Sequence, residues 1–164
     1  MPLPLTPAQQ KAVDALVRSG ALRAVRPDEK KARAFLSGAE SALADVPNVT
    51  RTENRYNLAY KAAHDVGEAV LAGYGYKTTY GAGGHVKVGR FLAAIFDTPP
   101  PRDAAAHYDV MRLDRNANNY LGKPVTHAAA DAAAEAAQST SSSTSGRSRR
   151  GRRSRCATVS APAA

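Results

Sequence analysis

The chain has 164 residues and a formal net charge of +9, a length that suits one globular domain. Six arginines lie in the acid-free segment 139–164, so residues 1–138 carry only +3. A single cysteine, Cys156, excludes an internal disulfide framework and a Cys-based zinc cluster, and no apolar run is long enough to span a membrane. We therefore expect a cytoplasmic protein with no membrane partner.

Two helices are predicted in the first 45 residues. Thr6 suits an N-cap and Pro7 a first helical turn, and the apolar-periodic segment that follows ends at Gly20. Pro27 opens a second helix, which stops near Asp45. The apolar side of this second helix carries Ala34, Phe35, Ala39 and Leu43.

The third segment, residues 50–72, has the clearest helical pattern. Its stripe combines small residues with tyrosines at three-four spacing: Tyr56, Ala59, Tyr60, Ala63, Val66, Gly67 and Val70. Small side chains let a neighbouring helix approach closely, so this helix is expected to pack inside a bundle. His64 and Asp65 lie off the stripe, and we interpret them as a solvated or lightly paired edge.

Residues 73–84 form a segment rich in glycine and tyrosine, followed directly by His85. Its glycines could expose backbone amides to a phosphate at the next helix start, but no strand precedes it and Arg90 stands where a P-loop needs lysine. A flexible interhelical loop is the favoured interpretation. His85 lies where it could meet a phosphate at the helix N-terminus; a contact with the loop is the alternative.

Two further helices follow the loop. The fourth begins at Val86 and carries an apolar face of Val88, Phe91, Leu92, Ile95 and Phe96. The fifth follows Pro99–Pro101, and its predicted core stripe consists of Ala106, Val110, Leu113, Ala117 and Tyr120. The opposite side carries Tyr108, Met111 and Arg115, which we expect to contact another helix of this chain or a second subunit.

The predicted fold class is all-α, an antiparallel bundle of four to five main helices over residues 1–138. Residues 125–138 are alanine-rich, and we expect a weakly docked helix there. Residues 139–164 lack the apolar surface needed to offset ordering entropy, so a disordered Ser/Arg-rich tail is predicted. Its cations, Arg147, Arg149, Arg150, Arg152, Arg153 and Arg155, would attract polyanions without sequence preference.

Residues 113–120 gather an arginine and three carboxamides, Arg115, Asn116, Asn118 and Asn119, just before Gly122 and Pro124. A polar helix end followed by Gly and Pro is an ordinary stop signal. The alternative is a ligand site, because the arginine presents a fork of donors that matches phosphate or carboxylate.

The order of features over residues 50–120 resembles a HEPN domain, the higher-eukaryote and prokaryote nucleotide-binding family. The resemblance is carried by the segment Ala69–Tyr76, by the step from the glycine loop to His85 and by the pair Arg115-Asn116. It implies an α-helical bundle, often a homodimer, whose arginine motif faces a cleft between subunits.

Many HEPN domains are metal-independent endoribonucleases of toxin-antitoxin or phage-defence systems, in which a histidine follows the signature arginine after four to six residues. The resemblance implies catalytic positions at Arg115 and Tyr120, and this chain departs from the pattern because Tyr120 stands where the histidine would be. A tyrosine with a pKa near 10 is a poor proton carrier at pH 7, so turnover should suffer more than binding. Tyr120 could instead stack on a base or pack in the core.

The leading expectation is therefore an RNA- or nucleotide-binding domain with weak or absent ribonuclease activity. Its ligand-binding residues would be Arg115, Asn116, Asn119 and His85. One alternative is an endoribonuclease that recruits His85, His107 or Tyr120 as proton carrier; another is an oligomerisation protein whose polyanion affinity lies in the tail. The resemblance also implies an antitoxin or nucleotidyltransferase partner, whereas the four separated histidines predict no metal site and nothing indicates a cofactor.

Overall fold

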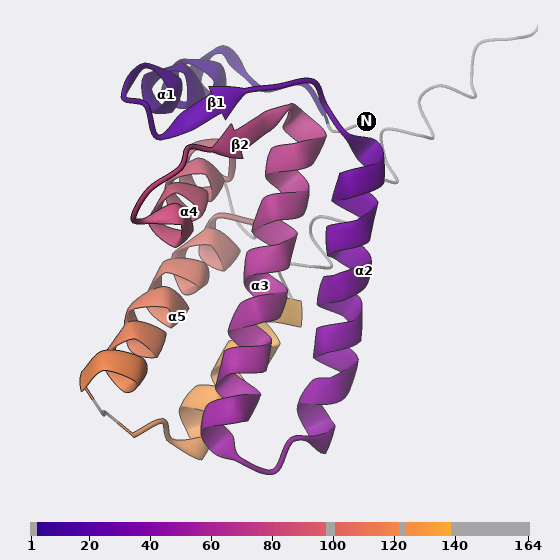
Figure 1. The fold of residues 1–164 in the computed structure, drawn as a ribbon, viewed down its shortest axis with the longest axis vertical. Coiled ribbons are helices and arrows are strands. Elements are labelled where there is room, and N and C mark those ends of the chain that lie inside the picture. Colours follow the sequence, from indigo (N-terminus) through magenta and orange to yellow (C-terminus); the bar gives the residue numbers. More distant parts are fainter. Residues whose placement is uncertain (1–2, 98–100, 122–123, 139–164) are drawn as a thin grey trace, which may run out of the picture.

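The computed structural model describes residues 3–97, 101–121 and 124–138, which fold as an all-α bundle with one small sheet (Figure 1). This confirms the predicted fold class; the predicted tail, residues 139–164, lies outside the described residues. The elements in chain order are α1 Pro7–Arg18, β1 Leu22–Ala24, α2 Glu29–Asp45, the 3-10 helix η1 Val46–Asn48, α3 Thr52–Tyr74, β2 Tyr76–Thr78, α4 Gly84–Ile95 and α5 Pro101–Leu121. A further helix covers residues 127–138.

The long helices α2 and α3 lie side by side as an antiparallel pair that runs the length of the molecule (Figure 1). Helix α1 begins as predicted, since Thr6 Oγ1 accepts from the Gln9 amide and the Gln9 side chain accepts from the Thr6 amide. Helix α2 starts two residues after Pro27 because the Asp28 carboxylate caps the Lys31 amide. All seven residues of the predicted α3 stripe are buried.

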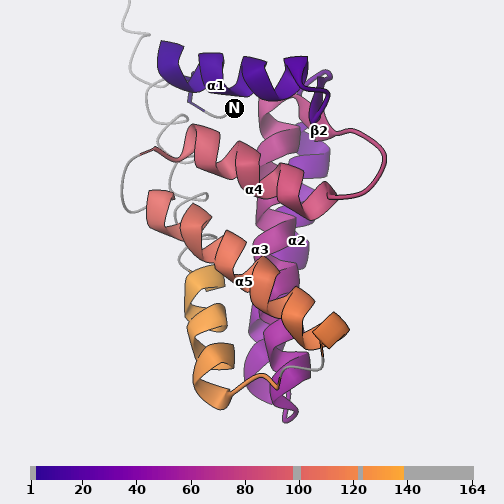
Figure 2. The ribbon, with the colours of Figure 1, turned by 90° about the vertical axis from the view of Figure 1, so that its left-hand side faces the viewer.

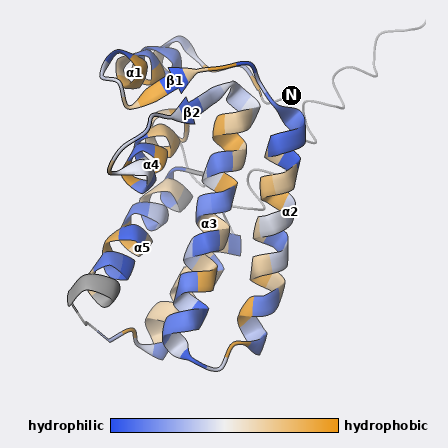
Figure 3. Ribbon diagram, in the orientation of Figure 1, coloured by the Kyte–Doolittle hydropathy of each residue, from blue (hydrophilic) through white to orange (hydrophobic). Residues whose placement is uncertain are grey.

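Helices α4 and α5 cover the same side of α3, and α1 crosses the end of the bundle beyond α4 (Figure 2). Figure 3 shows hydrophobic residues distributed among polar ones along each helix. Helix α3, at the centre of the bundle, is buried on more than one face. The predicted apolar face of α4 is confirmed, because Val88, Phe91, Leu92, Ile95 and Phe96 are all buried. Close packing depends on Gly67, where an added Cβ would lie 2.5 Å from Cγ1 of Val88.

The glycine-rich segment 73–84 is not wholly a loop, as the sequence had indicated. It contains β2, which pairs antiparallel with β1 in the register Leu22↔Thr78 and Ala24↔Tyr76. Gly75 ends α3 with φ +79, and its carbonyl accepts from the Val25 amide at 2.8 Å. Strands of three residues are too short to show a period-two pattern, so this pairing could not be predicted.

The predicted core stripe of α5 was wrong. Val110 and Leu113 are each 54% exposed, whereas Tyr108 and Met111 are buried against the bundle. Of the two partners considered for the Tyr108 side, another helix of the same chain is the one observed. Tyr56 of α3 donates its hydroxyl proton to the Met111 carbonyl at 3.2 Å.

The helix over residues 127–138 packs along α3 through small side chains. Ala130, Ala133 and Ala137 are buried, and Arg55 of α3 forms an ion pair with Asp131 at 2.8 Å. The alanine-rich pattern therefore predicted the helix correctly, and the structure adds its docking contacts. Among the described helices, none has both the length and the apolar character that a membrane span requires.

Candidate functional site

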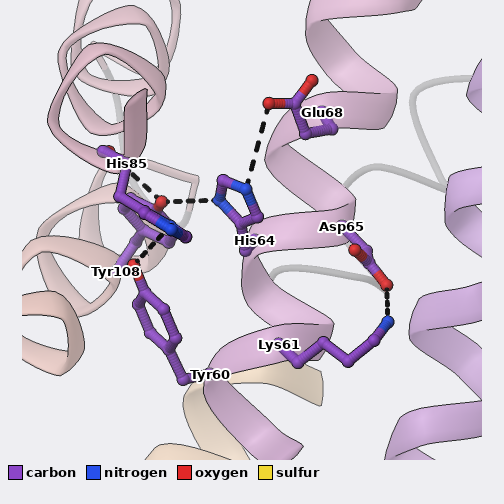
Figure 4. A network of polar contacts seen from close by, with 7 residues as sticks. All are labelled: Tyr60, Lys61, His64, Asp65, Glu68, His85 and Tyr108. Carbon is purple, nitrogen blue, oxygen red and sulfur yellow. Dashed lines mark hydrogen bonds and ion pairs between the residues drawn. The ribbon is translucent and has the colours of Figure 1, made fainter. Parts of the chain in front are cut away.

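Helix α3 carries a row of polar residues on the side that faces α4 and α5. Asn57, Tyr60, His64 and Glu68 recur at intervals of three, four and four residues, so they share one edge of the helix. Asp65, next to His64 in sequence, points toward α2 instead and pairs with Lys61 (Figure 4). Of the two roles predicted for His64 and Asp65, the paired one is observed and the solvated one is not, since both side chains are packed, on different faces of α3.

Two other helices complete the cluster. His85 lies in the first turn of α4, and α5 contributes Tyr108 and Arg115. Gly89 lets α5 approach α4, since an added Cβ would lie 3.2 Å from the Tyr108 ring. We call Tyr60, His64, His85, Tyr108 and Arg115 the histidine–arginine cluster.

Hydrogen bonds link the two histidines to the two tyrosines (Figure 4). The Tyr60 hydroxyl bonds Nδ1 of His85 at 3.0 Å, and Nδ1 of His64 bonds the Tyr108 hydroxyl at 2.9 Å. Tyr108 donates to the His85 backbone carbonyl at 3.2 Å. The imidazole centroids of His64 and His85 are 4.2 Å apart.

These bonds fix the tautomer of His64. A phenol has one proton, and Tyr108 gives it to a carbonyl that can only accept. Nδ1 of His64 must therefore carry the hydrogen that Tyr108 accepts, which leaves Nε2 with a lone pair when the ring is neutral. Nε2 lies 3.9 Å from a carboxylate oxygen of Glu68.

The guanidinium of Arg115 lies over the Tyr60 ring, with its Cζ 5.1 Å from the ring centroid. Its Nε donates to Oδ1 of Asn57 at 3.3 Å, the one hydrogen bond that Arg115 makes with other described side chains. This contact and this bond hold the guanidinium beside the Tyr60 ring, and its terminal nitrogens make no hydrogen bond to another described side chain. The side chain is only partly buried, so a ligand from solvent can reach it.

Burial sets the charge state of the cluster. It lowers the pKa of His64 to about 4, with a further contribution from His85, and together with the charges of Arg115 and Arg112 it lowers the pKa of His85. Burial also raises the pKa of Tyr60 and Tyr108. At neutral pH the cluster therefore holds two neutral imidazoles, two protonated phenols and one permanent cation.

The structure brings two of the predicted site residues together, Arg115 and His85. Asn116 is exposed one position further along α5. Asn119 and Tyr120 belong to α5, but their side chains lie outside the described residues, as does the whole of the predicted nucleic-acid tail. His107 is exposed on α5, with no hydrogen bond to the cluster among the described residues.

Sequence reasoning missed the roles of Asn57, His64 and Tyr108, and took Tyr60 only as a core residue. The signal was the polar row on α3, where His64 follows Tyr60 by four residues. The sequence prediction for α3 considered only its apolar stripe, so the polar row was not recognised. Tyr108 could not be assigned to the site because the orientation of α5 was predicted wrongly.

The chemistry of the cluster suits an anion that exchanges protons. An arginine fork binds phosphate or carboxylate oxygens, and neutral imidazoles accept or relay protons. Across residues 3–97, 101–121 and 124–138, no group of His, Cys, Asp or Glu side chains is arranged to hold a metal ion.

Comparison with known proteins gives no match to this chain, whether to a protein family, to a curated protein or to a solved structure. The HEPN resemblance therefore rests on the residues quoted above.

Proposed function

We propose that this chain is a HEPN-like domain that binds RNA or a nucleotide through the histidine–arginine cluster. The observation that carries the proposal is the position of Arg115, stacked on Tyr60 beside the neutral pair His64 and His85. A phosphate placed on the guanidinium would reach imidazole nitrogens without needing a metal ion. Asn116, exposed on the same helix, would supply a further amide donor.

Binding is tested with labelled RNA and with mononucleotides, comparing the full chain, Arg115→Ala and Arg33→Ala. Arg33 is an exposed arginine on α2, so its replacement makes the same change in charge away from the cluster. The proposal predicts weaker binding for Arg115→Ala only. If both variants bind as tightly as the parent chain, and affinity disappears only on removal of residues 139–164, the oligomerisation protein with a polyanion-binding tail is the better description.

A second candidate function, metal-independent RNA cleavage, is favoured by the two histidines. The imidazole rings are 4.2 Å apart and each is hydrogen-bonded to a tyrosine. One neutral imidazole would take the 2′-hydroxyl proton as that oxygen bonds phosphorus, and the imidazolium so formed would deliver this proton to the 5′-oxygen as its bond to phosphorus breaks. His64 and His85 would thus replace the proton carrier that Tyr120 does not provide.

Cleavage is tested in EDTA with the parent chain, Arg115→Ala, His85→Ala and His64→Asn. General acid–base help is typically worth about a hundred- to ten-thousand-fold in rate, so each histidine variant should lose activity on that scale. A 2′,3′-cyclic phosphate product would match the proton transfers described. Absence of cleavage by the parent chain, with binding retained, would leave the binding function alone.

The assembly state completes the proposal. Ala106, Val110, Leu113 and Ala117 recur along the outer side of α5 at four-three-four spacing, and this stripe suits a homodimer of the HEPN type. An antitoxin or nucleotidyltransferase partner, in a toxin-antitoxin or phage-defence role, follows from the family resemblance. Sedimentation of the parent chain and of Leu113→Glu tests the homodimer, which the charge should dissociate.

A further inference from the structure

A groove of about 470 Å³ lies between α4 and α5, outside the histidine–arginine cluster. Its rim carries three arginines, Arg90, Arg102 and Arg112, and its walls include the apolar side chains Ala93, Phe96 and Ala105. One acid, Asp109, lines it as well and holds Arg112 through a 2.8 Å ion pair. The lining of the groove therefore combines apolar side chains with an excess of positive charge.

The groove lies next to the cluster, although no cluster residue lines it. Val86, which lines it, directly follows His85 in α4. Arg112 also lines it, and the charge of Arg112 contributes to the lowered pKa of His85. Gly89 lies in the wall of the groove and against the Tyr108 ring. A ligand bound to Arg115 and extended along α5 would enter this groove.

Two of the three arginines, Arg90 and Arg102, are available to such a ligand. Arg90 is exposed and makes no ion pair within the described part of the chain. Among the described residues Arg102 pairs with Asp103, at 3.6 Å, and both side chains are about 60% exposed, so the pair is easily opened. The positive charge of the lining favours an anionic occupant over the arginine-rich stretch 147–155 of this chain.

We infer that the groove binds the backbone phosphates of a single-stranded RNA whose neighbouring phosphate is held by Arg115. This inference rests on the proposed function, and it makes the preferred ligand an oligonucleotide instead of a mononucleotide. Arg102 and Arg115 are separated by about 20 Å along α5 at the usual helical rise. Successive phosphates of one strand are joined by a six-bond sugar-phosphate unit, so a strand of several nucleotides covers this distance.

The groove should hold the strand without reading its sequence. Arginines at the rim contact phosphates, and the methyl-lined wall around Ala93 and Ala105 offers no donor or acceptor to a base edge. Oligomers of different bases are therefore expected to bind with similar affinity.

The test measures the affinity of the full chain for uridine monophosphate and for hexauridylate as salt is varied. The double variant R90Q/R102Q is compared with R18Q/R33Q, which removes two exposed arginines from α1 and α2. We expect R90Q/R102Q to weaken hexauridylate binding on the order of tenfold and to leave the monophosphate unchanged. The logarithm of the binding constant falls linearly with the logarithm of the salt concentration, and each phosphate contact contributes about 0.7 to the magnitude of this salt slope. Loss of two contacts should therefore reduce the magnitude of the slope for hexauridylate by about 1.4.

Several results would overturn the inference. Equal losses in R90Q/R102Q and R18Q/R33Q would show a general charge effect, and competition by hexaglutamate as strong as that by hexauridylate would show a surface for any acidic polymer. Monophosphate binding that depends on Arg115, with no effect of R90Q/R102Q on the hexamer, would reject the groove and keep the proposed function. If Arg115→Ala changes neither ligand's affinity, the proposed function fails and the groove inference fails with it.

Discussion

At the scale of single residues, burial decides the protonation of His64, and this gives a prediction about stability. The folded pKa is about 4 and the unfolded value is 6.5, so the unfolded chain binds more protons as pH falls. Stability is therefore intact above pH 6.5 and declines toward pH 4. The expected loss from this group is about 2 kcal/mol at pH 5 relative to pH 8.

The control for this prediction is His64→Asn, which keeps a donor near the position of Nδ1 and does not titrate. Urea unfolding of both proteins at pH 5 and pH 8 measures the difference between their pH dependences. His85, whose pKa is also lowered, acts in the same direction in both proteins, so the difference between them reports His64 together with its coupling to His85. Identical pH dependences would mean that His64 is not buried in its neutral form.

A second residue-scale prediction concerns the close contact between α3 and α4. In Gly67→Ala the new Cβ would lie 2.5 Å from Cγ1 of Val88, a fully buried and rotationally stiff side chain. Overpacking costs about 1 to 3 kcal/mol, which exceeds the helix-propensity gain of about 1 kcal/mol, so net destabilisation is expected. Gly73→Ala is the matched control in the same helix: nothing lies within 4 Å, and it should stabilise by up to about 1 kcal/mol. Thermal unfolding of both variants gives the comparison, and a stabilised Gly67→Ala would contradict the packing.

At the scale of elements, the orientation of α5 can be tested with two truncations on opposite faces. Met111 is 4% exposed, so Met111→Ala should cost about 2 to 5 kcal/mol of unfolding free energy. Leu113 is 54% exposed, so Leu113→Ala in the monomer should change stability by about 0.5 kcal/mol or less. Both variants are unfolded at a protein concentration too low for dimerisation, so that the stability of the monomer is measured. If Leu113→Ala destabilised the protein more than Met111→Ala, the core stripe of α5 predicted from the sequence would be correct instead.

The error in α5 has a physical origin. Val110 and Leu113 are the larger aliphatic side chains, and a pattern read by hydrophobicity places them inside. The observed helix instead buries Tyr108 and Met111, and the buried Tyr108 hydroxyl hydrogen-bonds the His64 imidazole and the His85 carbonyl. Hydrogen-bond partners on other helices decide the rotation, and a single sequence does not reveal them.

At the scale of the whole molecule, the sequence predicted the bundle well because long helices with continuous apolar faces are a strong local signal. The stripe on α3 and the face of α4 were confirmed, whereas the pairing of β1 with β2 joins segments more than fifty residues apart. The candidate site likewise combines residues indicated by local sequence patterns with residues that only contacts between helices bring together. Arg115 and His85 were found from the family-like pattern, but His64 joins them only through contacts between helices.

The last prediction concerns how much the folded part and the arginine-rich segment each contribute to the affinity for RNA. Ending the chain at Gln138 keeps the helix over residues 127–138, whose buried alanines dock on the bundle, so the unfolding free energy should be unchanged. The six removed arginines would each contribute up to about 0.7 to the salt slope for a long single strand, a total near 4. Salt titration of the parent and the shortened chain should therefore show a much smaller slope for the latter, with the remaining affinity still sensitive to Arg115→Ala. Loss of that sensitivity in the shortened chain would mean that the cluster has no affinity of its own, and lower stability would mean that the removed segment packs on the fold.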